Sequence, residues 1–348
     1  MATTELNDRE RQVLAAVIRS YVETAEPAGS RTVSRRFGLG VSPATIRNTM
    51  SDLEEKGFLF HPHTSAGRVP TDKAYRVYVD ELMQVSPLER VQQQRLKAEI
   101  GQGRATLESI LRRAAQSLGV LSQELGVALG PRLEETVLTR LELVRLSAER
   151  LMLVLSLKGG AVRTIFIEVR GVIGDDALAE VQIVLNERLA GLTLSAIRTS
   201  LNARLRDAGT SGDSTELLNI FLQEGDQLFD VPSPAEGNEV VLGQASVLAD
   251  QPEFASGEKM RRLIELTETR TELATLLRAR KQHGGVQISI GGEHGGSLPG
   301  GLTVVTAQYT AGSLSGVIGV IGPTRMPYEK VIALVSHTSS LLTDLLDG

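Results

Sequence analysis

The stretch from Ser30 to Gly57 limits the possible fold more tightly than any other part of the chain. Its pattern predicts two short helices joined by a tight turn. We expect Ser30 to cap the first helix and Gly38 to end it. Ser42 then occupies an N-cap position with Pro43 directly behind it, which is a typical helix start. The second helix should therefore begin at Pro43.

The second helix has two contrasting faces. Ile46, Met50 and Leu53 follow a spacing of i, i+4 and i+7, which predicts a buried stripe, and Gly57 suits the stop. Side chains on the opposite face and its flanks are mostly short or polar and can reach base edges and the thymine methyl group. They are Ala44, Thr45, Arg47, Asn48, Ser51 and Glu55.

The charge of this stretch is one-sided. Between Pro27 and Ser51 there are four arginines and no Asp or Glu; the arginines are Arg31, Arg35, Arg36 and Arg47. Arginines beside a helix N-terminus make a surface that can dock phosphates. The pattern is that of a helix-turn-helix. On this stretch alone, an ordinary helical hairpin with a solvated basic face remains the alternative.

The residues that follow predict a β-hairpin. Two short apolar runs, 58–60 and 69–70, flank a loop that contains Gly67, lacks acid and carries His63, Ser65 and Arg68. A hairpin directly after a recognition helix is a wing, so we predict a winged helix-turn-helix. His61 and His63 have no third ligand nearby, and we expect phosphate or sugar contacts there instead of a metal.

Further helices are expected around this core. One covers 7–24, with Asn7 and Glu10 as a capping box, and another runs from a Thr71 cap to about Met83. After a linker at 86–103, leucines from Leu111 to Leu125 predict a long helix beginning near Arg104. Its seam can be a dimer contact or can pack on the sheet of its own domain.

The remainder alternates between strand and helix patterns. Period-two runs predict strands at 136–146, 151–157, 162–169, 286–290, 302–309 and 316–321. Helical patterns fill the middle of this region, and a closing helix covers 328–346. Strands on both sides of a mainly helical block indicate an α+β domain interrupted by an insertion.

Composition excludes several classes of protein. The chain of 348 residues has no Cys, which rules out a disulfide framework, a thiol nucleophile and a Cys zinc site. The polar start predicts no signal peptide, and no apolar run is long enough to span a membrane, so we expect a cytoplasmic protein. The Gly291–Gly301 run lacks the Lys of a phosphate loop and predicts a mobile hairpin loop. No nucleophile with a base is evident, so we expect no enzyme, no cofactor and no metal.

Three segments resemble one family closely: LNDRERQVLAAVIRSYVETAEPAGSRTVS, VSPATIRNTMSDLEEKGFL and HPHTSAGRVPTDKAYRVYVD. They are similar to the N-terminal domain of the HrcA family, the heat-inducible transcription repressors of bacteria. A looser similarity continues to GVIGVIGPTRMPYEKVIALV near the end of the chain. The resemblance implies an α+β multidomain protein in which a GAF-like domain is interrupted by an inserted, mainly helical dimerisation domain. It also implies control of chaperone operons through an inverted-repeat operator, and activity maintained by the GroE chaperonin.

These expectations give a domain plan and a set of contacts. We expect a winged helix-turn-helix at 1–85, a linker at 86–103, GAF-like parts at 104–171 and 251–348, and the dimerisation domain at 172–250. The expected contacts of a homodimer with double-stranded DNA are Arg31, Arg35, Arg36, Ser42, Ala44, Thr45, Arg47, Asn48, Ser51, His63, Ser65 and Arg68. The alternatives are a small-ligand-sensing metabolic regulator and an RNA-binding or structural module.

Overall fold

The computed structural model describes residues 6–63, 66–101, 107–131, 136–158, 162–169, 173–206, 213–228, 240–268, 270–280, 285–295, 298, 300–312 and 314–347. The chain forms two compact units. The first comprises Met1–Leu129, Val240–Gln308 and Val317–Leu341, and the second Gly130–Glu239, Tyr309–Gly316 and Leu342–Gly348. Helices and antiparallel sheets occur together, so the expected α+β class is confirmed.

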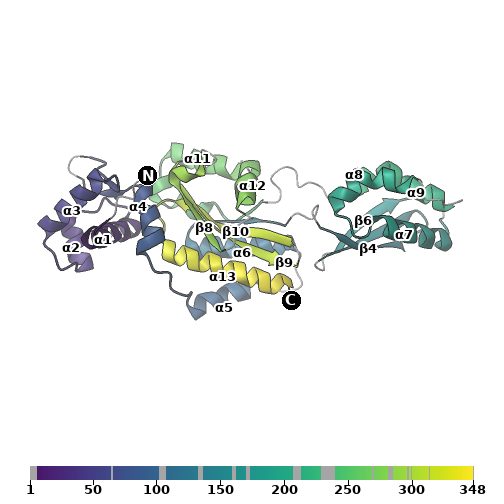
Figure 1. Ribbon diagram of the computed structural model, residues 1–348, viewed down its shortest axis with the longest axis horizontal. Coiled ribbons are helices and arrows are strands. Elements are labelled where there is room, and N and C mark those ends of the chain that lie inside the picture. The colour runs from purple at the N-terminus through teal and green to yellow at the C-terminus, as the bar shows by residue number, and fades with distance from the viewer. Residues whose placement is uncertain are drawn as a thin grey trace. The chain divides into compact units, whose positions relative to one another are not determined.

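The first unit begins with a group of helices and a hairpin, here called the head (residues 6–83; Figure 1). Its elements are α1 (Asp8–Thr24), α2 (Ser30–Phe37), α3 (Pro43–Glu55), β1 (Leu59–Phe60), β2 (Val69–Pro70), α4 (Asp72–Val77) and the π-helical turn η1 (Tyr78–Leu82).

The capping box predicted for α1 is present. The Asn7 side chain accepts a hydrogen bond from the Glu10 amide at 3.0 Å, and the Glu10 carboxylate accepts one from the Asn7 amide at 2.9 Å. Lys56, just after α3, also donates to Glu10 at 2.7 and 2.8 Å. Burial raises the pKa of Glu10, but the bonds from Lys56 and Asn7 outweigh it and leave the pKa lowered. One carboxylate therefore caps α1 and fixes the end of α3.

The two helices of the Ser30–Gly57 stretch form as predicted, with one correction at the first cap. Gly29 is the N-cap of α2 and Ser30 is already helical, because the extended backbone lies one residue earlier than expected. Ser42 does cap α3, accepting from the Thr45 amide at 3.1 Å. The predicted stripe of Ile46, Met50 and Leu53 is buried.

The rest of the first unit, called the body, is built on a five-stranded sheet in the order β7-β3-β10-β9-β8. Its strands are β3 (Leu125–Leu129), β7 (Val240–Leu242), β8 (Val286–Ile290), β9 (Leu302–Ala311) and β10 (Leu314–Pro323). Its helices and turns are α5 (Arg90–Ile100), α6 (Leu107–Ser122), α10 (Ser246–Ala249), η4 (Pro252–Phe254), α11 (Gly257–Glu268), α12 (Arg270–Ala279), η5 (Gly291–His294) and α13 (Tyr328–Asp347).

Helices cover both faces of this sheet (Figure 1). Leu273 and Leu277 of α12 pack with Leu125 and Val127 of β3 on one face. On the other face α6 approaches so closely that a Cβ on Gly126 would lie 1.8 Å from the Ala115 carbonyl oxygen. Only glycine fits at that position.

The helix expected to reach Leu125 ends at Ser122, which is a correction. Gln123 adopts a left-handed conformation with φ of 64°, which stops the helix, and Leu125 starts β3 instead. Leu111 and Leu118 are buried where α6 packs against the sheet. Within the described residues, the leucine seam therefore serves the sheet of its own domain.

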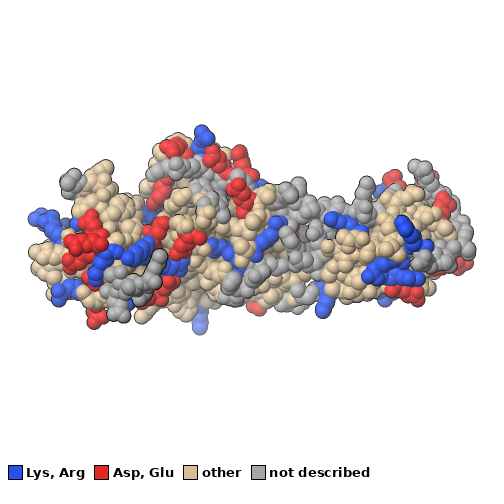
Figure 2. Space-filling model, turned by 45° about the horizontal axis from the view of Figure 1, so that its top comes forward, with Lys and Arg blue, Asp and Glu red and all other residues tan. Residues whose placement is uncertain are grey.

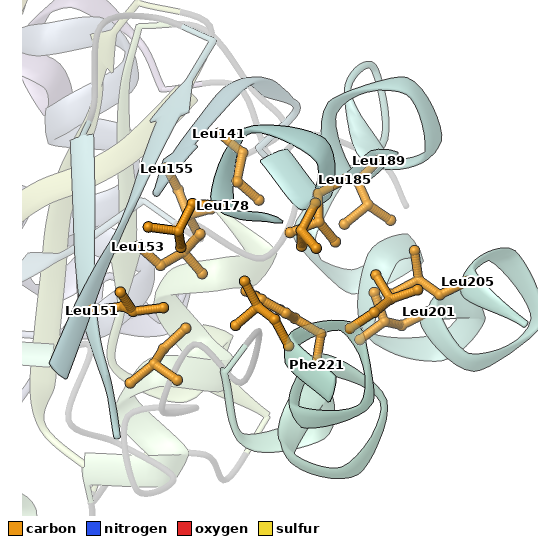
Figure 3. Close-up of a cluster of buried hydrophobic side chains, with 14 of the residues drawn as sticks. Leu141, Leu151, Leu153, Leu155, Leu178, Leu185, Leu189, Leu201, Leu205 and Phe221 are labelled. Carbon is orange, nitrogen blue, oxygen red and sulfur yellow. The ribbon is translucent and has the colours of Figure 1, made fainter. Parts of the chain in front are cut away.

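The second unit is a three-stranded antiparallel sheet covered by helices. Its elements are β4 (Leu138–Arg145), β5 (Arg150–Leu157), β6 (Val162–Glu168), α7 (Asp175–Leu189), α8 (Leu194–Leu205) and α9 (Asp213–Leu228). Leu151, Leu153 and Leu155 point from β5 toward leucines of the helices (Figure 3). Because the buried face of β5 finds its partners there, these strands belong with the helices. The unit starts at Gly130, earlier than the boundary expected at residue 172.

Candidate nucleic-acid interface

The outward face of α3 is an open polar surface. Because Ile46, Met50 and Leu53 point inward, Ala44, Arg47 and Asn48 are exposed, and Thr45 and Ser51 are half-buried. Among the described residues, neither the Arg47 nor the Asn48 side chain has a hydrogen bond or an ion pair. These two side chains are therefore free to meet a ligand.

The N-terminus of α3 is held by two hydroxyl groups. The Ser42 hydroxyl lies 2.9 Å from the Thr45 hydroxyl and also accepts from the Thr45 amide. Further along, Thr49 is buried and its hydroxyl donates to the Thr45 carbonyl at 3.1 Å. The hydroxyls of Ser42 and Thr45 thus fix the first turn of the helix while Ser42 remains exposed.

The arginines of α2 differ in their freedom. Arg31 and Arg35 are exposed, and Arg35 makes only a 3.4 Å bond to the Arg31 carbonyl among the described residues. Arg36 instead forms an ion pair with Glu23 of α1. In Figure 2, basic and acidic side chains lie beside one another over the head. Glu23, which precedes the stretch 27–51, therefore neutralises Arg36, one of the four arginines of that stretch.

Glu54 clamps the hairpin to α3. Its carboxylate lies 2.8 Å from Nδ1 of His61 and 2.8 Å from a guanidinium nitrogen of Arg68. The Arg68 side chain is only 13% exposed, so its place differs from the exposed phosphate contact that we expected. Of the other loop residues, His63 is exposed, and Ser65 lies outside the described residues.

The hairpin also joins the segment before α2. Ala28 and Arg68 exchange backbone hydrogen bonds at 2.8 and 2.9 Å. A Cβ on Gly67 would lie 2.5 Å from the Ala28 carbonyl, so glycine permits this approach. Backbone and side-chain bonds thus connect the hairpin strands to the segment before α2 and to α3.

The head meets the body through charged and aromatic side chains within the first unit. Arg76 of α4 donates to Glu293 and to the Ile288 carbonyl, each at 2.8 Å. Arg325 of the body donates to the Val22 carbonyl of the head at 2.7 Å. It also donates to Glu253, which is in the body as well, at 2.6 Å. None of these partners was evident from periodicity.

Two other features, a metal centre and a membrane-spanning helix, are not found in the described part of the chain. No group of three or more His, Asp or Glu there is arranged to hold a metal ion. In the same residues, no helix combines the length and apolarity that a membrane crossing requires.

Comparison with known proteins identifies the family. The model of the HrcA protein C-terminal domain matches residues 108–332. The heat-inducible transcription repressor HrcA of Chlorobium luteolum is 42% identical over 99% of both chains. This chain belongs to the HrcA family. A second HrcA repressor, from Geobacter sulfurreducens, is 38% identical over 99% of both chains.

Membership of the HrcA family confirms two expectations. The resemblance first seen in the N-terminal motifs extends over nearly the whole chain. The curated HrcA relatives are named as transcription repressors, so the expectation that the chain is not an enzyme is also confirmed. A crystal structure of a hypothetical protein, 22% identical over 99% of each chain, superimposes with a TM-score of 0.64 and shares the fold.

Proposed function

We propose that the chain is a heat-inducible transcription repressor whose head is a winged helix-turn-helix that binds an inverted-repeat DNA operator. The observation that carries this proposal is the outward face of α3, where Arg47 and Asn48 are exposed and free of partners among the described residues. The hairpin clamped by Glu54 has the place of a wing. Such a helix with an adjacent hairpin is suited to the major groove.

The proposed contacts fall into two groups. Ala44, Thr45, Arg47, Asn48 and Ser51 face the bases, where Arg favours guanine and Asn favours adenine. Phosphates are held by the N-terminus of α3 and by side chains around it. The phosphate group comprises Ser42, Arg31, Arg35, Arg36, His63 and Ser65. Arg68 acts indirectly, by holding the hairpin.

The remaining parts are proposed as a GAF-like body and a dimerisation unit. The outer face of the three-stranded sheet in the second unit carries an apolar row, in which Met152 pairs with Val144 on β4 and with Phe166 on β6. Phe166 is 58% exposed. A second copy of the chain covers such a face in a twofold dimer, and two heads then demand two half-sites.

A pair of DNA-binding titrations tests the head. Fluorescence anisotropy would compare a duplex carrying the inverted repeat of a chaperone operon with a shuffled duplex. We expect Asn48→Ala to lose roughly 1–3 kcal/mol on the operator and almost nothing on the shuffled duplex. Arg9→Ala, an exposed arginine of α1, is the control. Equal losses on both duplexes would remove Asn48 from the base-reading face.

We also propose that the GroE chaperonin maintains the active repressor in the cytoplasm. The support is the family and the chain itself, which has no Trp, no Cys and 34 Gly. Folded domains are stable by only about 5–15 kcal/mol, so mild heat can inactivate a marginal one. We expect operator binding to be lost irreversibly on heating and restored by chaperonin with ATP. Reversible loss, with one midpoint in both samples, would indicate an intrinsic switch instead.

A single observation favours the alternative of a ligand-sensing regulator. The body contains a polar hollow next to the contact between Arg76 and Glu293. This hollow does not compete with DNA binding, because it lies in a different part of the first unit.

A further inference from the structure

The hollow lies between α12 and the turn η5 and has a volume of about 650 Å³. That volume suits a small organic molecule. Its polar lining comes from Thr271, Glu272, Thr275, Arg280, Ser289, Glu293 and His294. Every lining residue belongs to the first unit and to the described part of the chain.

Arg280 is an unusual residue for this place. It is 9% exposed, and its guanidinium donates to Ser289, to the Val304 carbonyl and to the Thr306 hydroxyl, which are all neutral groups. No carboxylate forms an ion pair with it among the described residues. A buried charge normally has a counter-charge, because desolvation is costly without one. Among the described residues, the hollow therefore presents a cation whose hydrogen-bond partners are all neutral.

His294 adds a second unsatisfied group. It is 7% exposed, and its Nε2 lies 3.1 Å from the Leu302 carbonyl oxygen, so Nε2 carries the proton and donates. Nδ1 is buried and has no hydrogen-bond partner in the described chain. Burial lowers the pKa of His294, which keeps the ring neutral and Nδ1 an acceptor.

The acids that line the hollow do not take up this cation. Glu293 receives Arg76 from the head and the Ile290 amide at 2.8 Å, so its charge is already balanced. Glu272 is exposed. A ligand thus meets the guanidinium of Arg280 in the hollow, with an exposed carboxylate among the lining groups.

We propose that this hollow binds a small ligand through a carboxylate or phosphate group, with Arg280 as the anchor, and that occupancy is coupled to the head through Glu293. The planar fork of an arginine suits two oxygens of such an anion. Both anion types share this chemistry.

The coupling follows from the turn η5, which contacts α4 of the head and also lines the hollow. Glu293 holds Arg76 of α4, and the Gly292 amide donates to Asp72 of α4 at 3.0 Å. His294, in the same four-residue turn, lines the hollow. A ligand that moves this turn changes the head contacts, because all these bonds depend on its position. This part of the inference rests on the proposed DNA-binding function, whereas ligand binding does not.

Calorimetric titration of the full chain tests binding separately. The probes are inorganic phosphate and succinate, each against chloride at equal ionic strength. We expect at least one probe to bind, and Arg280→Met to weaken it by about tenfold or more. Arg270→Gln, an exposed arginine at the start of α12, should change nothing. Binding of phosphate but not succinate, or of succinate but not phosphate, shows which anion the hollow takes.

Two variants that differ in side-chain size at one position keep the test decisive if Arg280→Met fails to fold. Thr275 is exposed on α12 and lines the hollow. Thr275→Phe fills the space and should abolish binding, whereas Thr275→Val keeps the size and should preserve it. Binding that survives Thr275→Phe, or neither probe binding at millimolar concentration, overturns the proposal.

Coupling is measured on DNA with the probe that binds. We expect saturating probe to change the affinity of the wild-type chain for its operator, and Arg76→Ala to bind operator without responding to the probe. A response that persists in Arg76→Ala would refute the route through Glu293. Absence of any DNA binding in either chain would count against the proposed function and leave the titration result standing.

Discussion

The guanidinium of Arg68 lies 2.8 Å from the carboxylate of Glu54, so the hairpin is fastened to the outward helix by a largely enclosed ion pair. His61 reaches the other carboxylate oxygen. The Nε atom of Arg68 is buried without a partner in the described chain, so this arginine depends on Glu54 for its compensation.

Glu54→Gln should therefore loosen the hairpin without unfolding α3. Removing the charge leaves Arg68 nearly enclosed and uncompensated, at a cost of about 1–3 kcal/mol. We expect faster proteolytic cleavage within residues 61–68 and weaker operator binding. Glu55→Gln, which changes an exposed neighbour on the same helix, is the matched control. Identical cleavage rates in the two variants would show that the clamp contributes nothing.

Glu23 should restrain DNA binding, because its ion pair with Arg36 competes with phosphates for that arginine. Glu23→Gln frees the arginine, and we expect tighter binding to operator and shuffled duplexes alike, with a salt slope steeper by about one. Arg35→Ala should shift the slope in the opposite direction by a similar amount. Binding measured against salt concentration checks both, and an unchanged slope in Glu23→Gln would mean that Arg36 already contacts phosphate in the wild type.

Low pH should destabilise the head, because it protonates Glu10, which is 4% exposed. The pKa of Glu10 is lowered in the folded state. Its contribution to stability is therefore complete above pH 4.5, the ordinary pKa, and is lost as the pH falls through the folded-state pKa. Glu10→Gln should lower the melting temperature at neutral pH, and this difference should vanish in acid. Asp8→Asn is the exposed control on α1. A difference that persists in strong acid would point to packing.

Glu124 should show the opposite dependence. Burial raises the pKa of its carboxyl well above the ordinary value of 4.5, so the folded chain keeps the proton to higher pH than the unfolded chain. Stability attributable to this group falls as pH rises above 4.5 toward the folded pKa. Glu124→Gln should raise the melting temperature at neutral pH but not in acid. Destabilisation at neutral pH would instead mean that the ionised carboxylate is held by Arg325.

The apolar row of the second unit should determine assembly. Phe166→Asp places a charge on an exposed position, so it should not disturb the core but should prevent a second copy from covering the sheet. We expect sedimentation as a monomer and loss of cooperative binding to two half-sites. Ile183→Asp, at an exposed position on α7, is the control. A Phe166→Asp dimer would place the contact elsewhere.

Local features of the chain were predictable, because they depend on neighbours in sequence. The Asn7 capping box, the Ser42 cap and the buried stripe from Ile46 to Leu53 all form as expected. The limits of α6 were not, because the left-handed Gln123 breaks a leucine spacing that continues beyond it. Periodicity shows which face is buried but not where a backbone turns.

Pairings between distant residues also escaped prediction. Glu23 of α1 pairs with Arg36 in the last turn of α2, 13 residues away, and Arg76 meets Glu293 from 217 residues away. The Gly291–Gly301 run was expected to be a mobile loop, yet its first turn is the 3-10 element that holds Arg76. No charge pattern along the chain reports such contacts, because they exist only once the body has folded.

The order of strands in the body has a consequence for synthesis. β3 lies between β7 and β10, so its two neighbours leave the ribosome more than a hundred residues after it does. The second unit, which has a core of its own, can fold during that interval. The nascent chain meanwhile exposes the apolar strand Leu125–Leu129 with both edges unpaired, a form prone to aggregation. We therefore expect molecular chaperones to bind a ribosome-bound chain that ends before residue 240. A chain released after residue 323 should not be bound by them.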